Sequence, residues 1–183
     1  MAPLRSLGNT ASAFDDFYAR TGKDAAINPI VHGYWFSLLS GNGSDDDEPY
    51  GIAVDSDHSV YVTGWAESHG FGGRDASIAK YDLLGVLQWQ RTLGGSNADE
   101  GRGIAVDSSD NIYITGVTDN AGLIAKYNTS GVIQWQRKLG GSAQGYGIAI
   151  DSSDNVYICG SAGSNGILIA KYNSSGTIQG HRF

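Results

Sequence analysis

The chain repeats one sixteen-residue pattern three times, as GIAVDSDHSVYVTGWA at 51–66, GIAVDSSDNIYITGVT at 103–118 and GIAIDSSDNVYICGSA at 147–162. The repeat extends beyond this core, because QWQR precedes the second and third copies and IAKY follows all three. Between those two copies, equivalent residues lie 44 to 46 positions apart. Self-similarity at such a period indicates a repeat architecture, whatever the local propensities are.

Each copy predicts four short strands. In the middle copy they are 88–93, 103–107, 111–116 and 122–127, separated by Gly, Ser, Asn and Asp clusters that favour turns. Ile112 and Ile114 alternate with Tyr113 and Thr115, so both faces of this strand are apolar or aromatic, and we expect neighbouring sheets to cover both. The fold class is therefore all-β, with three four-stranded units typical of propeller blades.

The repeat accounts for the unusual composition. The chain has 183 residues and 27 glycines, roughly double the usual share of about 7%. Most of these glycines recur at equivalent turn and strand positions, so they indicate tight turns rather than a flexible linker. The three copies occupy 34–87, 88–133 and 134–178, with a partial fourth at 179–183.

The repeat core resembles the beta-propeller repeats of the SBBP type. That pattern has the form G-I-A-V-D-x-x-G-N-V-Y-V-T-G followed by A-K-Y/L-x-x-x-G. The second copy matches it at Gly103, Asp107, Asn111, Tyr113, Gly116, Lys126 and Gly131, and the third at Gly147, Asp151, Asn155, Tyr157, Gly160, Lys171 and Gly176. The resemblance implies blade-like sheets and implies no particular activity.

Three copies do not obviously close by themselves, because single-chain propellers usually have about four to eight blades. Two bare blade faces would be a large apolar liability. Three solutions remain open from the sequence. Several chains share one ring, the bare faces dock on another protein, or the three repeats close as a β-trefoil, which is the alternative fold. We therefore expect a homo-oligomer or a place in a larger assembly.

Residues 1–33 contain no copy of the repeat and form a separate segment, an extended and short-helical N-terminal arm. Thr10 or Ser12 is a candidate helix cap and Gly22 a helix stop. Such a short helix is unstable alone in water, so its apolar face must rest on something. That surface is either the chain's own repeats or a partner. For the partner we predict docking through Leu4, Leu7, Phe14, Phe17 and Tyr18.

The segment MAPLRSLGN, followed by SAFDDFYARTG and Gly-rich SBBP-like repeats, resembles small structural and tail-fibre-like virion proteins of bacteriophages that infect marine cyanobacteria. This resemblance implies a virion location, with other virion proteins as partners. Residues 1–25 lack the apolar run of about 7–15 residues that a signal peptide needs, and no stretch of about 20 apolar residues predicts a membrane span. We therefore expect synthesis in the host cytoplasm without export.

The charges disfavour two classes of partner. The net charge is −7, and because residues 1–33 sum to zero, the repeats carry all of it. Such a body repels phosphate backbones and anionic headgroups, so we expect neither nucleic-acid nor membrane binding. The single Cys159 excludes an internal disulfide.

Little in the sequence points to catalysis or to a cofactor. Four histidines share no metal-binding spacing, and paired catalytic carboxylates cannot be separated from turn aspartates. The acidic run 45–48 lacks the ligand spacing of an EF-hand loop, and the DSSDN segments match turns that bond their own backbone. We interpret both as turns or solvated loops, with calcium as the alternative, and we predict a protein without enzymatic activity.

The expanded loop 66–75 of the first copy is the best candidate for a ligand site, because binding sites are often loops on a rigid scaffold. Trp65 has no equivalent in the other copies, where Val117 and Ser161 follow the same glycine. The candidate residues are Trp65, Glu67, His69, Phe71 and Arg74. They support the alternative function, a lectin-like module that binds a glycan or receptor on the host surface. The leading function is a non-enzymatic structural or adaptor protein of a phage virion.

Overall fold

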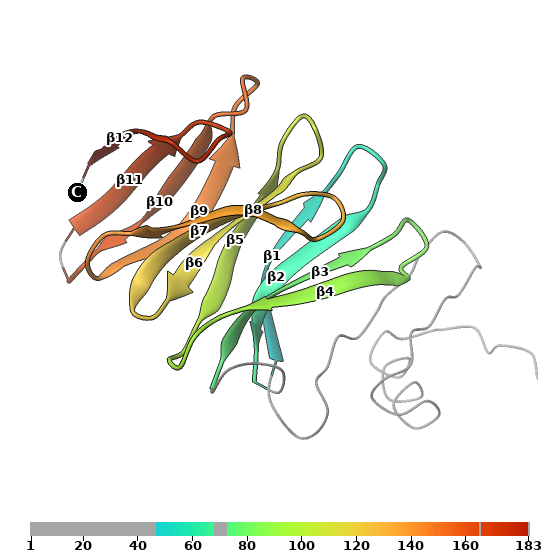
Figure 1. Cartoon of the computed structure of the whole chain (residues 1–183), viewed down its shortest axis with the longest axis horizontal. Coiled ribbons are helices and arrows are strands. Elements are labelled where there is room, and N and C mark those ends of the chain that lie inside the picture. Colours follow the sequence, from blue (N-terminus) through green and yellow to red (C-terminus); the bar gives the residue numbers. More distant parts are fainter. Residues whose placement is uncertain (1–46, 68–72, 165, 183) are drawn as a thin grey trace, which may run out of the picture.

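A computed structural model describes residues 47–67, 73–164 and 166–182. They form three antiparallel sheets of four strands each (Figure 1). The first sheet contains β1 (Asp47–Val54), β2 (Val60–Ala66), β3 (Asp75–Tyr81) and β4 (Leu87–Leu93). The second contains β5 (Glu100–Val106), β6 (Ile112–Thr118), β7 (Ala121–Tyr127) and β8 (Ile133–Leu139). The third contains β9 (Ala143–Ile150), β10 (Val156–Ala162), β11 (Gly166–Tyr172) and β12 (Ile178–Arg182).

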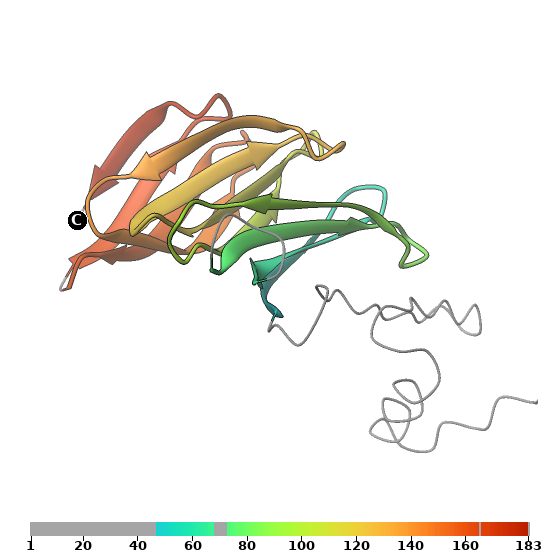
Figure 2. The ribbon, with the colours of Figure 1, turned by 60° about the horizontal axis from the view of Figure 1, so that its bottom comes forward.

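The three sheets lie side by side in chain order, with the middle sheet between the other two (Figures 1 and 2). Each sheet is a meander in which consecutive strands pair. Separate meanders of this kind are the arrangement of propeller blades, not the closed barrel of a β-trefoil. The all-β class and the blade-like units are thus confirmed. The predicted N-terminal arm lies outside the described residues.

The sheets are offset from the sequence repeats by one strand. The sequence placed QWQRTL, 88–93, at the start of the second unit, whereas β4 is the last strand of the first sheet. Two hydrogen bonds between the backbones of Asp82 and Val86, and of Gly85 and Asp82, form a tight turn that holds β4 against β3. The longer 94–99 segment instead carries the chain to the next sheet. A short turn favours antiparallel pairing, and this decides which sheet the strand joins.

Strands β1 and β5 begin earlier than the turn pattern predicts. In β5 the register shifts between Gly101 and Gly103, and the bulge lets Glu100 pair with Val117. The same irregularity lies between Pro49 and Gly51 of β1. As a result, Asp47 and Glu48 of the acidic run 45–48 belong to a strand. An extra residue at a bulge continues the pairing that the sequence pattern alone would end.

The bulge explains a recurrent glycine. A Cβ added at Gly116 would overlap the backbone carbonyl of Glu100, and one at Gly160 would overlap that of Gln144. The neighbouring strand lies too close for any side chain. Glycine is therefore required here by the close approach of two backbones.

Both faces of the middle sheet are buried. Ile112 and Ile114 pack with Tyr61 and Ile78 of the first sheet. Tyr113, from the opposite face of the same strand, packs in the cluster of the third sheet. The prediction that both sides are covered is confirmed for this sheet. None of the described residues forms a helix long and apolar enough to cross a membrane.

We expect Gly116→Ala to destabilise the protein by about 2 kcal/mol or more, because the added methyl group must displace a strand backbone. Gly140→Ala is the matched control, since an added Cβ there has nothing within 4 Å. Urea unfolding of both variants measures the difference. Equal stability of the two would contradict the close-approach explanation.

Candidate functional site

The turn between β5 and β6 is organised around one carboxylate. Asp107 accepts hydrogen bonds from the backbone amides of Ser109 at 3.0 Å and Asn111 at 2.8 Å. It also accepts one from the Tyr113 hydroxyl at 3.0 Å, and Lys126 lies 3.2 Å away. The oxygens of the Asp107 carboxylate thus accept hydrogen bonds from donors of its own sheet. This geometry supports the interpretation of the DSSDN segment as a turn.

The other two sheets contain the same arrangement. Asp55 accepts from Ser59 and Tyr61, with Lys80 at 3.4 Å. Asp151 accepts from Asn155 and from the Tyr157 hydroxyl. Burial acts to raise the pKa of the Asp107 carboxyl, but hydrogen bonds from Asn111 and Tyr113 outweigh it and hold the pKa below its ordinary value. The side-chain hydrogen bond from Asn155 is the main cause that lowers the pKa of Asp151 to about 2.

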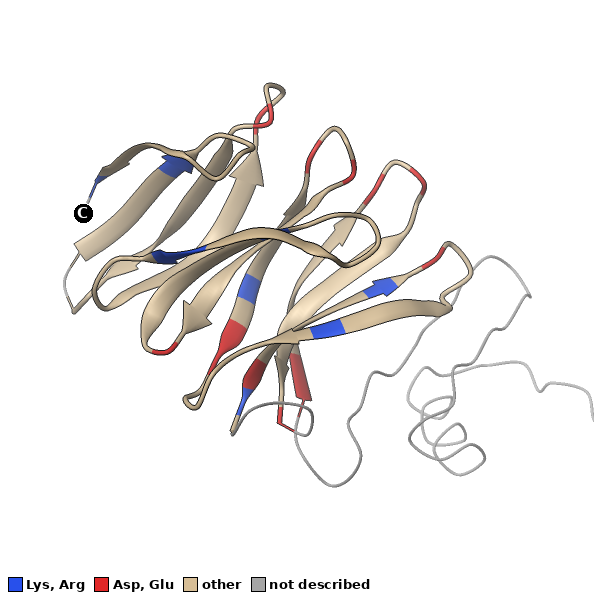
Figure 3. Ribbon diagram, in the orientation of Figure 1, with Lys and Arg blue, Asp and Glu red and all other residues tan. Residues whose placement is uncertain are grey.

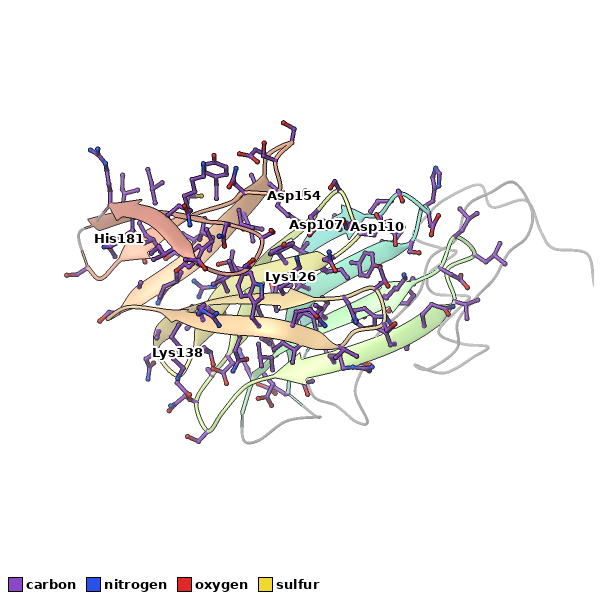
Figure 4. All side chains as sticks on the ribbon, turned by 45° about the horizontal axis from the view of Figure 1, so that its top comes forward. Asp107, Asp110, Lys126, Lys138, Asp154 and His181 are labelled. Carbon is purple, nitrogen blue, oxygen red and sulfur yellow. The ribbon has the colours of Figure 1, made fainter. Side chains whose placement is uncertain are left out.

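Adjacent sheets are joined by one polar contact at these turns. Ser56 donates to Asp110 through both its amide, at 2.9 Å, and its hydroxyl, at 2.7 Å. Ser108 makes the same pair of contacts with Asp154, at 3.0 and 2.8 Å. Figure 4 places Asp107, Asp110 and Asp154 along the same edge, and Figure 3 shows acidic residues at the turns after β1, β5 and β9. The acidic edge is therefore part of the sheet-to-sheet contact.

A tryptophan joins the outer strands. Trp89 of β4 donates to the carbonyl of Thr129, at 3.0 Å, and its ring lies against Gly131 of the next sheet. Trp135 of β8 repeats this contact with Ser174, at 3.1 Å, and Gly176. The recurrent tryptophans therefore serve packing between sheets.

The apolar contact between sheets also repeats. Ile104 and Val106 of β5 pack on the cluster that contains Tyr61 and Ile78. Ile148 and Ile150 of β9 pack on the cluster that contains Tyr113 and Ile124. The first strand of each later sheet thus inserts two aliphatic side chains against the Tyr and Ile of the sheet before it.

At the two ends of the row this contact is incomplete. Tyr157 and Ile169 are 36% and 54% exposed, whereas their equivalents Tyr113 and Ile124 are both 0% exposed. We call this surface of β10 and β11 the trailing face, and it consists of Tyr157, Cys159, Ile167 and Ile169.

At the other end, Ile52 and Val54 of β1 are 69% and 55% exposed. These two residues form the leading face. Large apolar side chains in such contiguous patches mark interaction surfaces. The sequence indicated both faces through the number of repeats, because a row of three blades has two outer surfaces.

The structure brings three predicted ligand-loop residues together. Trp65 is only 3% exposed, and its indole donates to the Tyr50 hydroxyl at 3.1 Å. The guanidinium of Arg74 lies 3.9 Å from the Trp65 ring centre and 3.5 Å from Glu67. A sugar stacking on this ring would first have to displace Arg74. His69 and Phe71 lie outside the described residues, so the ligand loop stays a prediction.

The five predicted docking residues, Leu4, Leu7, Phe14, Phe17 and Tyr18, also lie outside the described residues. Of the acidic run, Glu48 accepts a hydrogen bond from the Tyr50 hydroxyl at 3.1 Å, and Asp47 lies in β1. Within 47–67, 73–164 and 166–182, no three His, Cys, Asp or Glu side chains are grouped to hold a metal ion.

Sequence reasoning missed one hollow. It has a volume of about 240 Å³ and is lined by Leu139, Leu168, Tyr172, Ile178 and His181, among others. These residues come from β8, β11 and β12, so only the packed sheets bring them together. The lining is mostly apolar, with His181 and Lys138 as its polar side chains.

A family model for a beta-propeller repeat, SBBP, matches the sequence at 35–72, 88–124 and 134–167, which together make up more than half of the chain. A search of curated proteins returned no match.

Among solved structures, a protein of unknown function from Bacteroides caccae is 12% identical with a TM-score of 0.53, over 82% of this chain and 49% of that one. A catalytically inactive virginiamycin B lyase from Staphylococcus aureus with quinupristin is 16% identical, TM-score 0.47, over 77% and 57% of the two chains. A putative gluconolactonase is 14% identical, TM-score 0.48, over 81% and 52%. The chain spans about half the length of these structures. The likeness to the first shows the fold alone.

The lowered pKa of Asp107 predicts an acid-dependent stability. A carboxyl whose folded pKa lies below its unfolded value of about 3.9 stabilises the protein above that pH and loses this contribution as the pH falls through the folded pKa. We therefore expect Asp107→Asn to have a shallower decline in the free energy of unfolding below about pH 4. Denaturant unfolding at several pH values measures it. An identical slope in both proteins would contradict the assignment.

Proposed function

The chain belongs to the SBBP beta-propeller repeat family, and we propose that it is a non-enzymatic structural or adaptor protein that works through contacts with other proteins. One observation supports this most directly. Both ends of the row of sheets expose aliphatic or aromatic side chains whose equivalents are buried or partly buried at the two internal junctions. Uncovered surfaces of this composition favour association with protein.

The chemistry of the turns is consistent with a structural role. The carboxylates with lowered pKa values are held by turn amides, tyrosines and lysines of their own sheets. A perturbed carboxylate marks an active site only when it lies in a cleft with a partner for substrate chemistry, and structural networks also perturb pKa values. The net charge of −7 disfavours nucleic acid and anionic membranes as partners.

We further propose that the parent assembly is a phage virion, in which residues 1–33 attach the chain and the repeats face outward or cement neighbouring subunits. This part rests on the resemblance of the N-terminal segment to phage structural proteins. A docking arm followed by a repetitive β body suits such a role, because the arm supplies attachment while the sheets supply a rigid surface.

Deleting residues 1–33 tests the attachment. We expect the truncated chain to remain folded by circular dichroism and to be lost from purified particles of the parent assembly. Double substitution of Phe14 and Phe17 by Ser should have the same effect with the chain length preserved. Incorporation of the truncated chain at the normal level would contradict the docking role of the arm.

The second candidate is a glycan-binding module, favoured by the clustering of Trp65, Glu67 and Arg74 beside the expanded loop. If it is correct, a glycan array will show binding that Arg74→Ala changes and Trp65→Ala abolishes. Trp135→Ala, a loss of a tryptophan elsewhere in the repeats, is the control and should leave that binding unchanged. Absence of binding to any glycan by the full chain would contradict this candidate.

A further inference from the structure

The chain contains one interface twice. At each internal junction, two aliphatic side chains of an incoming first strand pack on a Tyr and an Ile of the preceding sheet. Beside them, a turn serine of the preceding sheet donates to a turn aspartate of the incoming sheet. The junction therefore has a receiving side and an inserting side, and these are chemically different.

The trailing face is a receiving side that meets no inserting strand in the part of the chain that the structure describes. Tyr157 pairs with Lys171 in the third sheet as Tyr113 pairs with Lys126 in the middle sheet. Likewise, Ile169 pairs with Cys159 as Ile124 pairs with Thr115. Tyr157 and Ile169 are therefore the equivalents of Tyr113 and Ile124. Each internal counterpart is fully buried by the next sheet.

Among the described residues, the leading face is an inserting side that meets no receiving side. In β1, Ile52 pairs with Val62 and Val54 pairs with Val60. In β5, Ile104 pairs with Ile114 and Val106 pairs with Ile112 in the same register. Ile52 and Val54 are therefore the equivalents of Ile104 and Val106. The two faces lie at opposite ends of the row of sheets (Figures 1 and 2). One molecule thus displays both halves of the same junction, one on each outer sheet.

We propose that the leading face of a second copy of this chain packs on the trailing face of the first, and that the return contact closes a ring of two chains. The inference rests on the proposed function and names the partner of its exposed faces. Two chains supply six sheets, within the usual range of about four to eight blades. The contact is heterologous, because different patches meet, and two such contacts related by a two-fold axis close the pair.

The polar contact of the junction has a counterpart at both ends. Ser152 occupies the position of Ser56 and Ser108, the donors of the internal junctions. His58 occupies the position of the acceptors Asp110 and Asp154, with the same left-handed backbone, φ 63° against 61° and 58°. An imidazole nitrogen that carries no proton accepts a hydrogen bond. A Ser152 to His58 hydrogen bond between copies would therefore replace the serine to aspartate bond.

β12, the outer strand of the third sheet, lacks the tryptophan that is present at both internal junctions. Gly180 of β12 lies opposite Lys171, as Trp89 lies opposite Lys80 and Trp135 opposite Lys126. The tryptophan that lies over the neighbouring turn at both internal junctions is therefore missing at this end. The contact between copies should be weaker than those within a chain, and Gly180→Trp should strengthen it.

Sedimentation equilibrium of the full chain tests the pair. We expect a dimer, converted to a folded monomer by Ile169→Asp and equally by Ile52→Asp. Ile133→Asp changes an equally apolar, exposed residue of the middle sheet outside both faces, and should remain dimeric. Circular dichroism verifies that each variant is folded. A monomeric full chain would overturn the inference, and would leave the proposed function to be decided by the deletion of residues 1–33.

Mixing the two charged variants tests the head-to-tail geometry. Ile52→Asp retains a normal trailing face and Ile169→Asp a normal leading face, so each alone is a monomer and the mixture forms a dimer through one intact contact. If trailing faces pair with each other, Ile52→Asp alone stays dimeric, and this result overturns the proposal.

The gain-of-contact variant provides a positive test. An added Cβ at Gly180 has nothing within 4 Å, so Gly180→Trp is tolerated sterically. We expect its dimer dissociation constant to fall about tenfold, which corresponds to about 1.4 kcal/mol. In the Ile52→Asp background the same tryptophan should not restore a dimer. An unchanged dissociation constant in Gly180→Trp would overturn the placement of β12 at the contact.

Discussion

The structure depends on the burial of two apolar faces per sheet. A four-stranded meander with Ile112 and Ile114 on one side and Tyr113 and Ile124 on the other has no face that suits water. Burying one such side chain contributes about 1.5–3 kcal/mol, so leaving a face uncovered forfeits several of these contributions. The middle sheet meets this requirement inside the chain because it has a neighbour on each side. Within 47–67, 73–164 and 166–182, the outer sheets meet it on one side only.

Polar contacts determine how the sheets are placed relative to one another. Hydrophobic burial is not directional, so it does not fix one alignment of two flat faces. The bond from Ser56 to Asp110 joins the β1–β2 and β5–β6 turns, and the bond from Trp89 to the Thr129 carbonyl joins β4 to the β7–β8 turn. Together they define the alignment of these two sheets. Their repetition at the next junction gives the same geometry again. This is why the exposed end faces can be compared residue by residue with buried ones.

The exposed end faces connect the fold to the proposed role. The Asp107 carboxylate stabilises its own turn, and the cation of Arg74 covers Trp65. The described residues present mainly exposed apolar faces, the leading face and the trailing face, to other molecules. A family of repeats that stack by shape and burial is well suited to assembly, because each added sheet or chain uses the contact already present within the molecule.

The sequence by itself determined the repeat, the all-β class, the four strands of each unit and the position of the turns, because periodic apolar residues and Gly, Asn and Asp clusters are local signals. It also indicated that Ile112 and Tyr113 face different neighbours and that three units leave faces uncovered. Only the tertiary structure decided that QWQRTL completes the preceding sheet, that Gly116 is required by the approach of Glu100, and that Arg74 lies over Trp65. These features depend on how close two paired backbones lie and on the direction of each side chain, which the repeat pattern does not encode.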